Sequence, residues 1–149
     1  MRRGLVRIVA VAALTLGLAA ATVGAPTPAS AQLRRAKMLS WVNHSRAEHH
    51  VHRLRMVRSV VGLAHDHNVA MARKDRLFHS SDLGSKLRYV RWHSWGENIG
   101  AGVTPYGLFK AYMASPEHRA NMLSTGFDRV GISFIERHGI LWSTLIFYG

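Results

Sequence analysis

The chain has 149 residues and a net charge of +12, with 20 Lys and Arg against 8 Asp and Glu, and it contains no cysteine. The absence of cysteine excludes disulfide bonds and a cysteine nucleophile, so packing and hydrogen bonds must hold the fold. The positive charge favours polyanionic partners, although it could equally serve to keep a small protein in solution.

The first 31 residues have the pattern of a secretory signal peptide. Three arginines precede an uncharged run over residues 8–23, and Ala29-Ser30-Ala31 matches the small-residue rule for cleavage. The run is shorter than the roughly 20 residues that span a bilayer, and two prolines follow it, which argues against a retained membrane anchor. We therefore expect a secreted protein, cleaved after Ala31, with a single domain over residues 32–149.

Cleavage would leave 17 Lys and Arg against the same 8 acidic residues, a net charge of about +9. Nucleic acid is the usual partner of such a charge, but export argues against it. Anionic cell-envelope polymers or lipids are then the expected partners. A chain exported without cysteine is also more typical of bacteria than of animals or plants.

Apolar residues at three- and four-residue steps predict two helices, over residues 36–49 and 57–74. The connection over residues 44–58 carries four histidines and four arginines, which is typical of a solvated face or a mobile segment. His49 and His52 could share a helix face, but no carboxylate joins them at a firm spacing.

The next two segments are predicted to be loops. Residues 77–83 leave the second helix, and His79 follows an apolar pair there, so a histidine at the core edge is the structural alternative for it. Residues 84–102 are rich in glycine. Their Gly96-x-x-x-Gly100-x-Gly102 spacing resembles a phosphate-binding loop, but no Lys-Ser or Lys-Thr follows, which argues against nucleotide binding.

Two further helices are expected to begin at Thr104-Pro105 and Ser115-Pro116, each with an N-cap residue followed by proline. Ser115 is predicted to cap the free amides. The positive end of this helix should favour the neutral form of His118.

Alternating apolar residues over 130–148, with a turn near residues 137–139, predict a closing antiparallel hairpin. Helices followed by a terminal sheet indicate an α+β domain, with helices packed on an antiparallel sheet.

Three side chains are candidates for a common cleft: His79, Glu97 and His118. We expect them within a few ångströms of one another. Two imidazoles and one carboxylate could form a structural polar network, or could bind zinc, completed by water, or magnesium. Ser80 beside His79 is a possible nucleophile, but sequence neighbours seldom form a nucleophile–base pair, and no hydrolase motif is present.

Several ordered motifs over residues 39–148 resemble the CAP superfamily, or SCP-domain proteins, which includes cysteine-rich secretory proteins, antigen 5 and pathogenesis-related 1 proteins. The pattern is closest to the bacterial branch. The motifs are Val42-Asn43 with Arg46, Ala70-Met71-Ala72, Leu77 with His79-Ser80, Gly96-Glu97-Asn98-Ile99, Ser115-Pro116-Glu117-His118-Arg119 with Asn121, Val130-Gly131-Ile132, and Trp142 with Phe147.

This resemblance implies an α-β-α sandwich with a central cleft. His79, Glu97 and His118 map onto three positions of a site that binds a divalent metal in some members, whereas the fourth, acidic position falls on Ser115 and a neighbouring tryptophan is Tyr112. CAP-like folds serve several functions. Our first hypothesis is a secreted binding module for envelope lipid or polymer, and the alternative is a metal-dependent hydrolase of cell-envelope or extracellular material.

Overall fold

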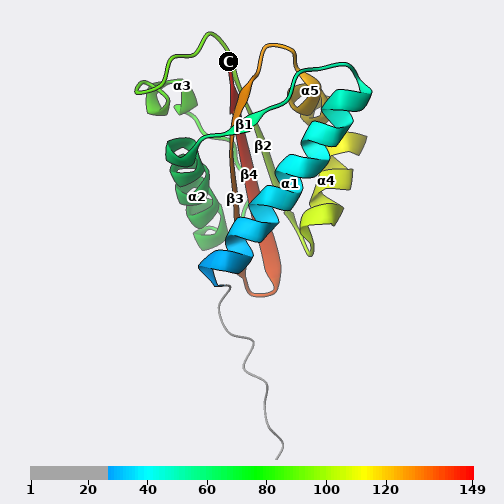
Figure 1. Cartoon of the computed structure of the whole chain (residues 1–149). Coiled ribbons are helices and arrows are strands. Elements are labelled where there is room, and N and C mark those ends of the chain that lie inside the picture. Colours follow the sequence, from blue (N-terminus) through cyan, green and yellow to red (C-terminus); the bar gives the residue numbers. More distant parts are fainter. Residues whose placement is uncertain (1–26) are drawn as a thin grey trace, which may run out of the picture.

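The computed structural model describes residues 27–149. Figure 1 shows three layers, in which a central sheet separates α2 and α3 from α1, α4 and α5. The α+β class and the expected α-β-α sandwich are therefore confirmed. The helices are α1 (Pro28–Glu48), α2 (Arg58–Arg73), α3 (Leu83–Lys86), α4 (Pro105–Ala114) and α5 (Pro116–Leu123), and the strands are β1 (Arg55–Met56), β2 (Trp95–Gly102), β3 (Arg129–Arg137) and β4 (Ile140–Tyr148).

The first helix begins earlier than the predicted residue 36. Pro28 occupies its first turn, and the Thr27 hydroxyl accepts a hydrogen bond from the Ser30 amide at 3.2 Å, which caps the helix. Most of the expected signal peptide, residues 1–26, lies outside the described residues, and the expected cleavage position falls in the first turn of α1. Within residues 27–149, no helix is both long enough and apolar enough to cross a membrane.

The sheet has the strand order β1-β3-β4-β2. The predicted hairpin is confirmed as β3 and β4, and its two-residue turn has positive φ at both His138 (53°) and Gly139 (74°), as a type I′ turn requires. The expected antiparallel sheet is in fact mixed, because β1 pairs in parallel with β3. Two residues of the basic connection over residues 44–58 form this short strand.

The prediction of a loop over residues 84–102 is confirmed only for residues 87–94. It was wrong for the end of α3 and for Trp95–Gly102, which is the edge strand β2, paired antiparallel with β4. Its glycines allow the helices to approach closely. A Cβ atom at Gly96 would lie 2.6 Å from Asn121 Oδ1, and one at Gly100 would lie 2.7 Å from the Tyr112 hydroxyl. Glycine in this strand therefore reflects tight packing and not a turn.

A completely buried arginine joins α1 to the segments around α5. The Arg46 guanidinium donates hydrogen bonds to the carbonyl oxygens of His52 (2.7 Å, from Nε), Met122 (2.9 Å, from Nη1) and Phe127 (2.7 Å, from Nη2). Burial lowers the pKa of Arg46 from its usual value. Three acceptors from separate segments replace the water that this cation has lost.

We expect Gly131→Ala to destabilise the domain by about 1–3 kcal/mol, because α2 rests directly on β3 at this residue. A Cβ atom there would lie 2.4 Å from the backbone carbonyl carbon of Val60. Gly62→Ala on the same helix is the control: it meets nothing within 4 Å and should stabilise by about 0.5–1 kcal/mol. Urea denaturation measures both, and equal stability of the two variants would contradict this packing.

Candidate functional site

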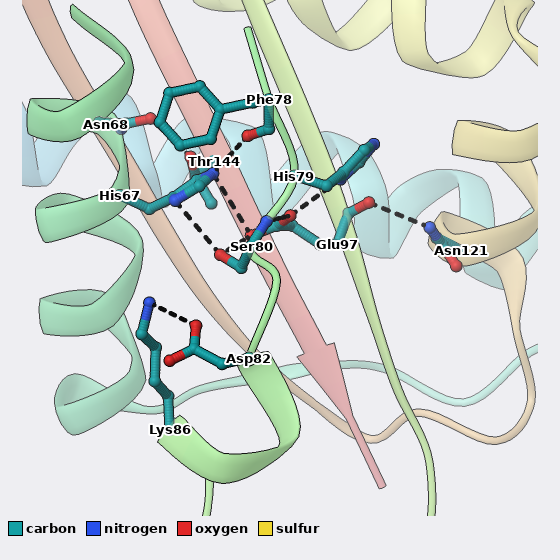
Figure 2. A network of polar contacts seen from close by, with 10 residues as sticks. All are labelled: His67, Asn68, Phe78, His79, Ser80, Asp82, Lys86, Glu97, Asn121 and Thr144. Carbon is teal, nitrogen blue, oxygen red and sulfur yellow. Dashed lines mark hydrogen bonds and ion pairs between the residues drawn. The ribbon is translucent and has the colours of Figure 1, made fainter. Parts of the chain in front are cut away.

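A buried carboxylate on β2 is the centre of the polar network in Figure 2. The Glu97 side chain is only 4% exposed. Its Oε2 lies 2.8 Å from His79 Nδ1 and accepts the Ser80 amide at 2.9 Å, while its Oε1 accepts the Ser80 hydroxyl at 2.7 Å. Both carboxylate oxygens therefore take part in hydrogen bonds, and Glu97 fixes the exposed His79 ring through its Nδ1 atom.

The sequence analysis missed a second histidine on this network, His67 of α2, which is buried beside Ser80. Its Nε2 lies 2.7 Å from the Phe78 carbonyl oxygen, which can only accept, so Nε2 carries a hydrogen. Its Nδ1 lies 3.2 Å from the Ser80 hydroxyl. The same hydroxyl makes its shorter contact with Glu97, so Ser80 links the buried imidazole to the carboxylate.

His118 is held on the other side of β2, by contacts to α4 and to the strand. Its Nδ1 lies 2.9 Å from the Ser115 hydroxyl, and its ring centroid lies 5.2 Å from that of Tyr112. Asn98 Nδ2 donates to the His118 carbonyl oxygen at 3.0 Å, while Asn121 Nδ2 donates to Asn98 Oδ1 at 2.9 Å. An amide pair thus fixes α5 against β2.

The expected cap by Ser115 was wrong, because its side chain makes no capping hydrogen bond and instead faces the His118 imidazole. Thr104, by contrast, caps α4 as predicted, through the Gly107 amide at 3.0 Å.

The pKa of His118 lies below its usual value, as expected, but burial is the largest cause. The charge of His79 lowers this pKa further, whereas the Glu117 carboxylate raises it. The two imidazoles are therefore close enough to interact electrostatically, although no hydrogen bond joins them among the described residues.

The structure thus brings His79 and Glu97 into direct contact, while His118 approaches from the opposite face of β2. Binding of a metal ion by these three residues stays a prediction. Within residues 27–149, no group of three or more His, Asp or Glu side chains is arranged to hold a metal ion. Glu97 Oε2 already accepts two hydrogen bonds and Oε1 accepts one, whereas the Nε2 atoms of His79 and His118 have no hydrogen-bond partner among residues 27–149.

Two histidines of the 44–58 connection, His49 and His52, have other partners. His49 Nδ1 donates to the Ser45 carbonyl oxygen at 2.7 Å, so its Nε2 is free to accept Arg119 Nη2 at 2.8 Å. His52 Nε2 donates to the Phe127 carbonyl oxygen at 2.9 Å. These two rings therefore connect the segment after α1 to Arg119 and Phe127 through hydrogen bonds.

A pocket of about 450 Å³ opens beside the network, between α2 and the segment that leads into α3. His67, His79 and Ser80 form its polar part. The remaining lining residues are Leu63, Asp66, Ala70, Lys74, Phe78, Ser81, Asp82, Leu83, Lys86 and Ile146.

Comparison with known proteins places this fold and site in context. Residues 39–141 match the model of the cysteine-rich secretory protein family, CAP. An uncharacterised protein of Bacillus subtilis, YkwD, is 36% identical over 55 residues, which cover 36% of this chain and 21% of that protein. The matched segment therefore spans about a fifth of the relative.

Solved structures share the fold at low sequence identity. An extracellular protein of Bacillus anthracis that contains an SCP domain has a TM-score of 0.73 at 22% identity, covering 84% of this chain and 44% of that one. A cysteine-rich secretory protein of Staphylococcus aureus has a TM-score of 0.68 at 19% identity, covering 82% and 40%. An outer surface protein of Borrelia burgdorferi has a TM-score of 0.72 at 13% identity, covering 78% and 92%.

We expect Glu97→Gln to destabilise the domain by about 2–4 kcal/mol, because an amide nitrogen would replace one of two oxygens that face only donors. Glu136→Gln is the matched control. Glu136 forms a partly exposed ion pair with Arg34 at 3.0 Å, so its loss should cost less than about 1 kcal/mol. Urea denaturation compares the two variants, and similar losses would argue against a special role for the Glu97 network.

A second prediction concerns His118, whose pKa should lie below about 6.5 in an NMR titration of the imidazole protons. Its contribution to stability should be present above pH 6.5 and be lost as pH falls through the depressed value, since the fold favours the neutral ring. His79→Gln should raise the pKa of His118, and Glu117→Gln should lower it. Shifts of the same sign in both variants would contradict the electrostatic account.

Proposed function

The chain belongs to the cysteine-rich secretory protein family, CAP, and we propose that it is a secreted binding module for an anionic lipid or polymer of the bacterial envelope. One observation carries the proposal: the pocket beside His79 combines an apolar floor, a fixed polar wall and a lysine rim. Its volume of about 450 Å³ lies in the range of small-molecule sites, roughly 300–1,000 Å³.

The floor and the rim suit different parts of an amphipathic ligand. Leu63, Phe78 and Ile146 offer apolar contact, which favours a hydrocarbon or sugar-ring surface. Lys74 and Lys86 supply positive charge at the edge, although Lys86 is paired with Asp82 at 2.9 Å. Lys74 lies 4.9 Å from the centre of the Phe78 ring and has no carboxylate partner within residues 27–149. It is therefore the cation most available to an anionic group.

The polar wall would select among such ligands. Glu97 holds His79 through Nδ1, so Nε2 of this exposed ring is directed by a rigid strand and not by a flexible loop. A ligand hydroxyl could donate a hydrogen bond to that nitrogen. The net charge of about +9 over residues 32–149 would attract polyanions from a distance and make association sensitive to salt.

The alternative, a metal-dependent hydrolase, has less support. It would require a metal ion held by the His79 and His118 imidazoles, with Glu97 only orienting His79. Hydrolysis of envelope material that stops on chelation and returns with zinc would favour this alternative over a binding module.

We expect Lys74→Gln to weaken binding of monomeric dihexanoyl phosphatidylglycerol by about fivefold, since one lysine near an anionic head group contributes on the order of 1 kcal/mol. Lys110→Gln is the matched control, because Lys110 also lies over an aromatic ring, 5.2 Å from the centre of Tyr106, but outside the pocket. Calorimetry should show the loss for Lys74 alone.

The same titrations with dihexanoyl phosphatidylcholine and with purified teichoic acid distinguish a lipid from a polymer ligand. Equal losses in the two lysine variants would indicate attraction by overall charge and contradict a ligand site in this pocket. No binding of any of the three probes would overturn the proposed function.

A further inference from the structure

A second, smaller pocket lies at the far end of α2, next to the β3–β4 turn, and it shares no lining residue with the pocket beside His79. Figure 1 shows this turn and the C-terminal end of α2 at the same end of the sheet. The pocket measures about 110 Å³, which suits a small ionic group and not a whole ligand. Its lining residues are Ala72, Arg73, Asp75, Arg137, His138 and Trp142.

A buried hydrogen-bond donor borders this pocket without a partner. Trp142 is 4% exposed, and its indole Nε1 has no acceptor among the described residues. A buried donor left in this state costs about 1–3 kcal/mol, so such groups are rare and usually have a partner such as water or an ion. Trp142 is also one of the lining residues, so an anion bound in the pocket would lie beside this side chain.

The two arginines that line the pocket form no ion pair among the described residues, so they are available to bind such an anion. Neither Arg73 nor Arg137 has a carboxylate within 4.0 Å among residues 27–149. Glu136, the acidic neighbour of Arg137, is held on the opposite face of β3 by Arg34 of α1 at 3.0 Å. Alternation along the strand thus separates this carboxylate from the pocket.

One carboxylate, that of Asp75, opposes an anion here. Asp75 has a φ of 47° and follows the end of α2, where the Met71 carbonyl oxygen accepts the amides of both Lys74 and Arg76. This carbonyl at the negative end of the helix is therefore satisfied by the backbone. Two guanidinium groups against a single carboxylate leave a net positive pocket, before any contribution from His138.

We propose that the pocket formed by Arg73, Arg137, His138 and Trp142 is a binding site for a phosphoryl or sulfuryl oxyanion. Guanidinium groups bind the oxygens of such anions in pairs, and Arg73 and Arg137 bring two of these groups to one small pocket. The source could be free phosphate or the phosphodiester of an envelope lipid or polymer. The site does not depend on the function proposed for the larger pocket.

The indole itself is the probe for the test. In a ¹H–¹⁵N NMR spectrum, the chain shows four tryptophan side-chain signals, and Trp142→Phe identifies the one from Trp142. Inorganic phosphate, titrated at constant ionic strength against chloride, should shift this signal in a saturable way. Titration with glycerophosphoglycerol, a soluble phosphodiester, then distinguishes the sources: saturable binding of both points to an envelope phosphodiester, and binding of inorganic phosphate alone points to the free anion.

Substitutions on exposed positions avoid damage to the core. Arg137→Gln should weaken phosphate binding by about tenfold or more, because it removes a charge-assisted pair of hydrogen bonds. Asp75→Asn should strengthen binding, since it removes the opposing charge. Arg53→Gln, which changes an exposed arginine outside the pocket, should leave the affinity unchanged.

Two results would overturn the proposal. A shift of the Trp142 signal that is linear and equal in all variants would mean an adventitious ion only. A Trp142 signal that does not respond to phosphate in the wild-type protein would show that the pocket does not bind the anion.

Discussion

The buried guanidinium of Arg46 is the interaction on which the rest of the structure depends. It is fully enclosed, and its three contacts are backbone carbonyl oxygens, two of which, from Met122 and Phe127, flank the end of α5. A shorter or uncharged side chain would leave these oxygens buried without donors. The position of α5, and with it that of His118, is therefore set by a residue of the first helix that never approaches the candidate site.

Two adjacent residues of β2, Glu97 and Asn98, each position one histidine of the site. Glu97 faces α2 and holds the side chain of His79, while Asn98 faces α5 and holds the backbone of His118. One edge strand thus holds both histidines, one from each of its faces. This requires two adjacent polar residues on β2, and Glu97 and Asn98 supply them. The arrangement keeps the two rings near each other without a direct bond between them.

Features governed by neighbours in the chain could be predicted from the sequence, and those governed by distant partners could not. The hairpin turn at residues 138–139 and the Thr104 cap depend on local geometry and were correct. The strand β2 was missed because its glycines make sense only against α4 and α5. The sequence analysis missed His67, which lies in a run of three polar residues whose side chains diverge along the helix, so that His67 is buried while its neighbours His65 and Asp66 stay exposed. Its spacing from Val60 and Ala64 on the buried stripe was the available signal.

The glycines of β2 also control which way its chemistry points. Gly96, Gly100 and Gly102 all lie at even positions and meet the helices on one face, where a Cβ atom has little room. A slip of one residue against β4 would turn the odd residues toward those helices and carry the Glu97 carboxylate away from His79. Such a misaligned sheet cannot close, because side chains would occupy the space that the glycines leave empty. The three glycines therefore select the register of β2 against β4, and this register places the Glu97 carboxylate on the same side as His79.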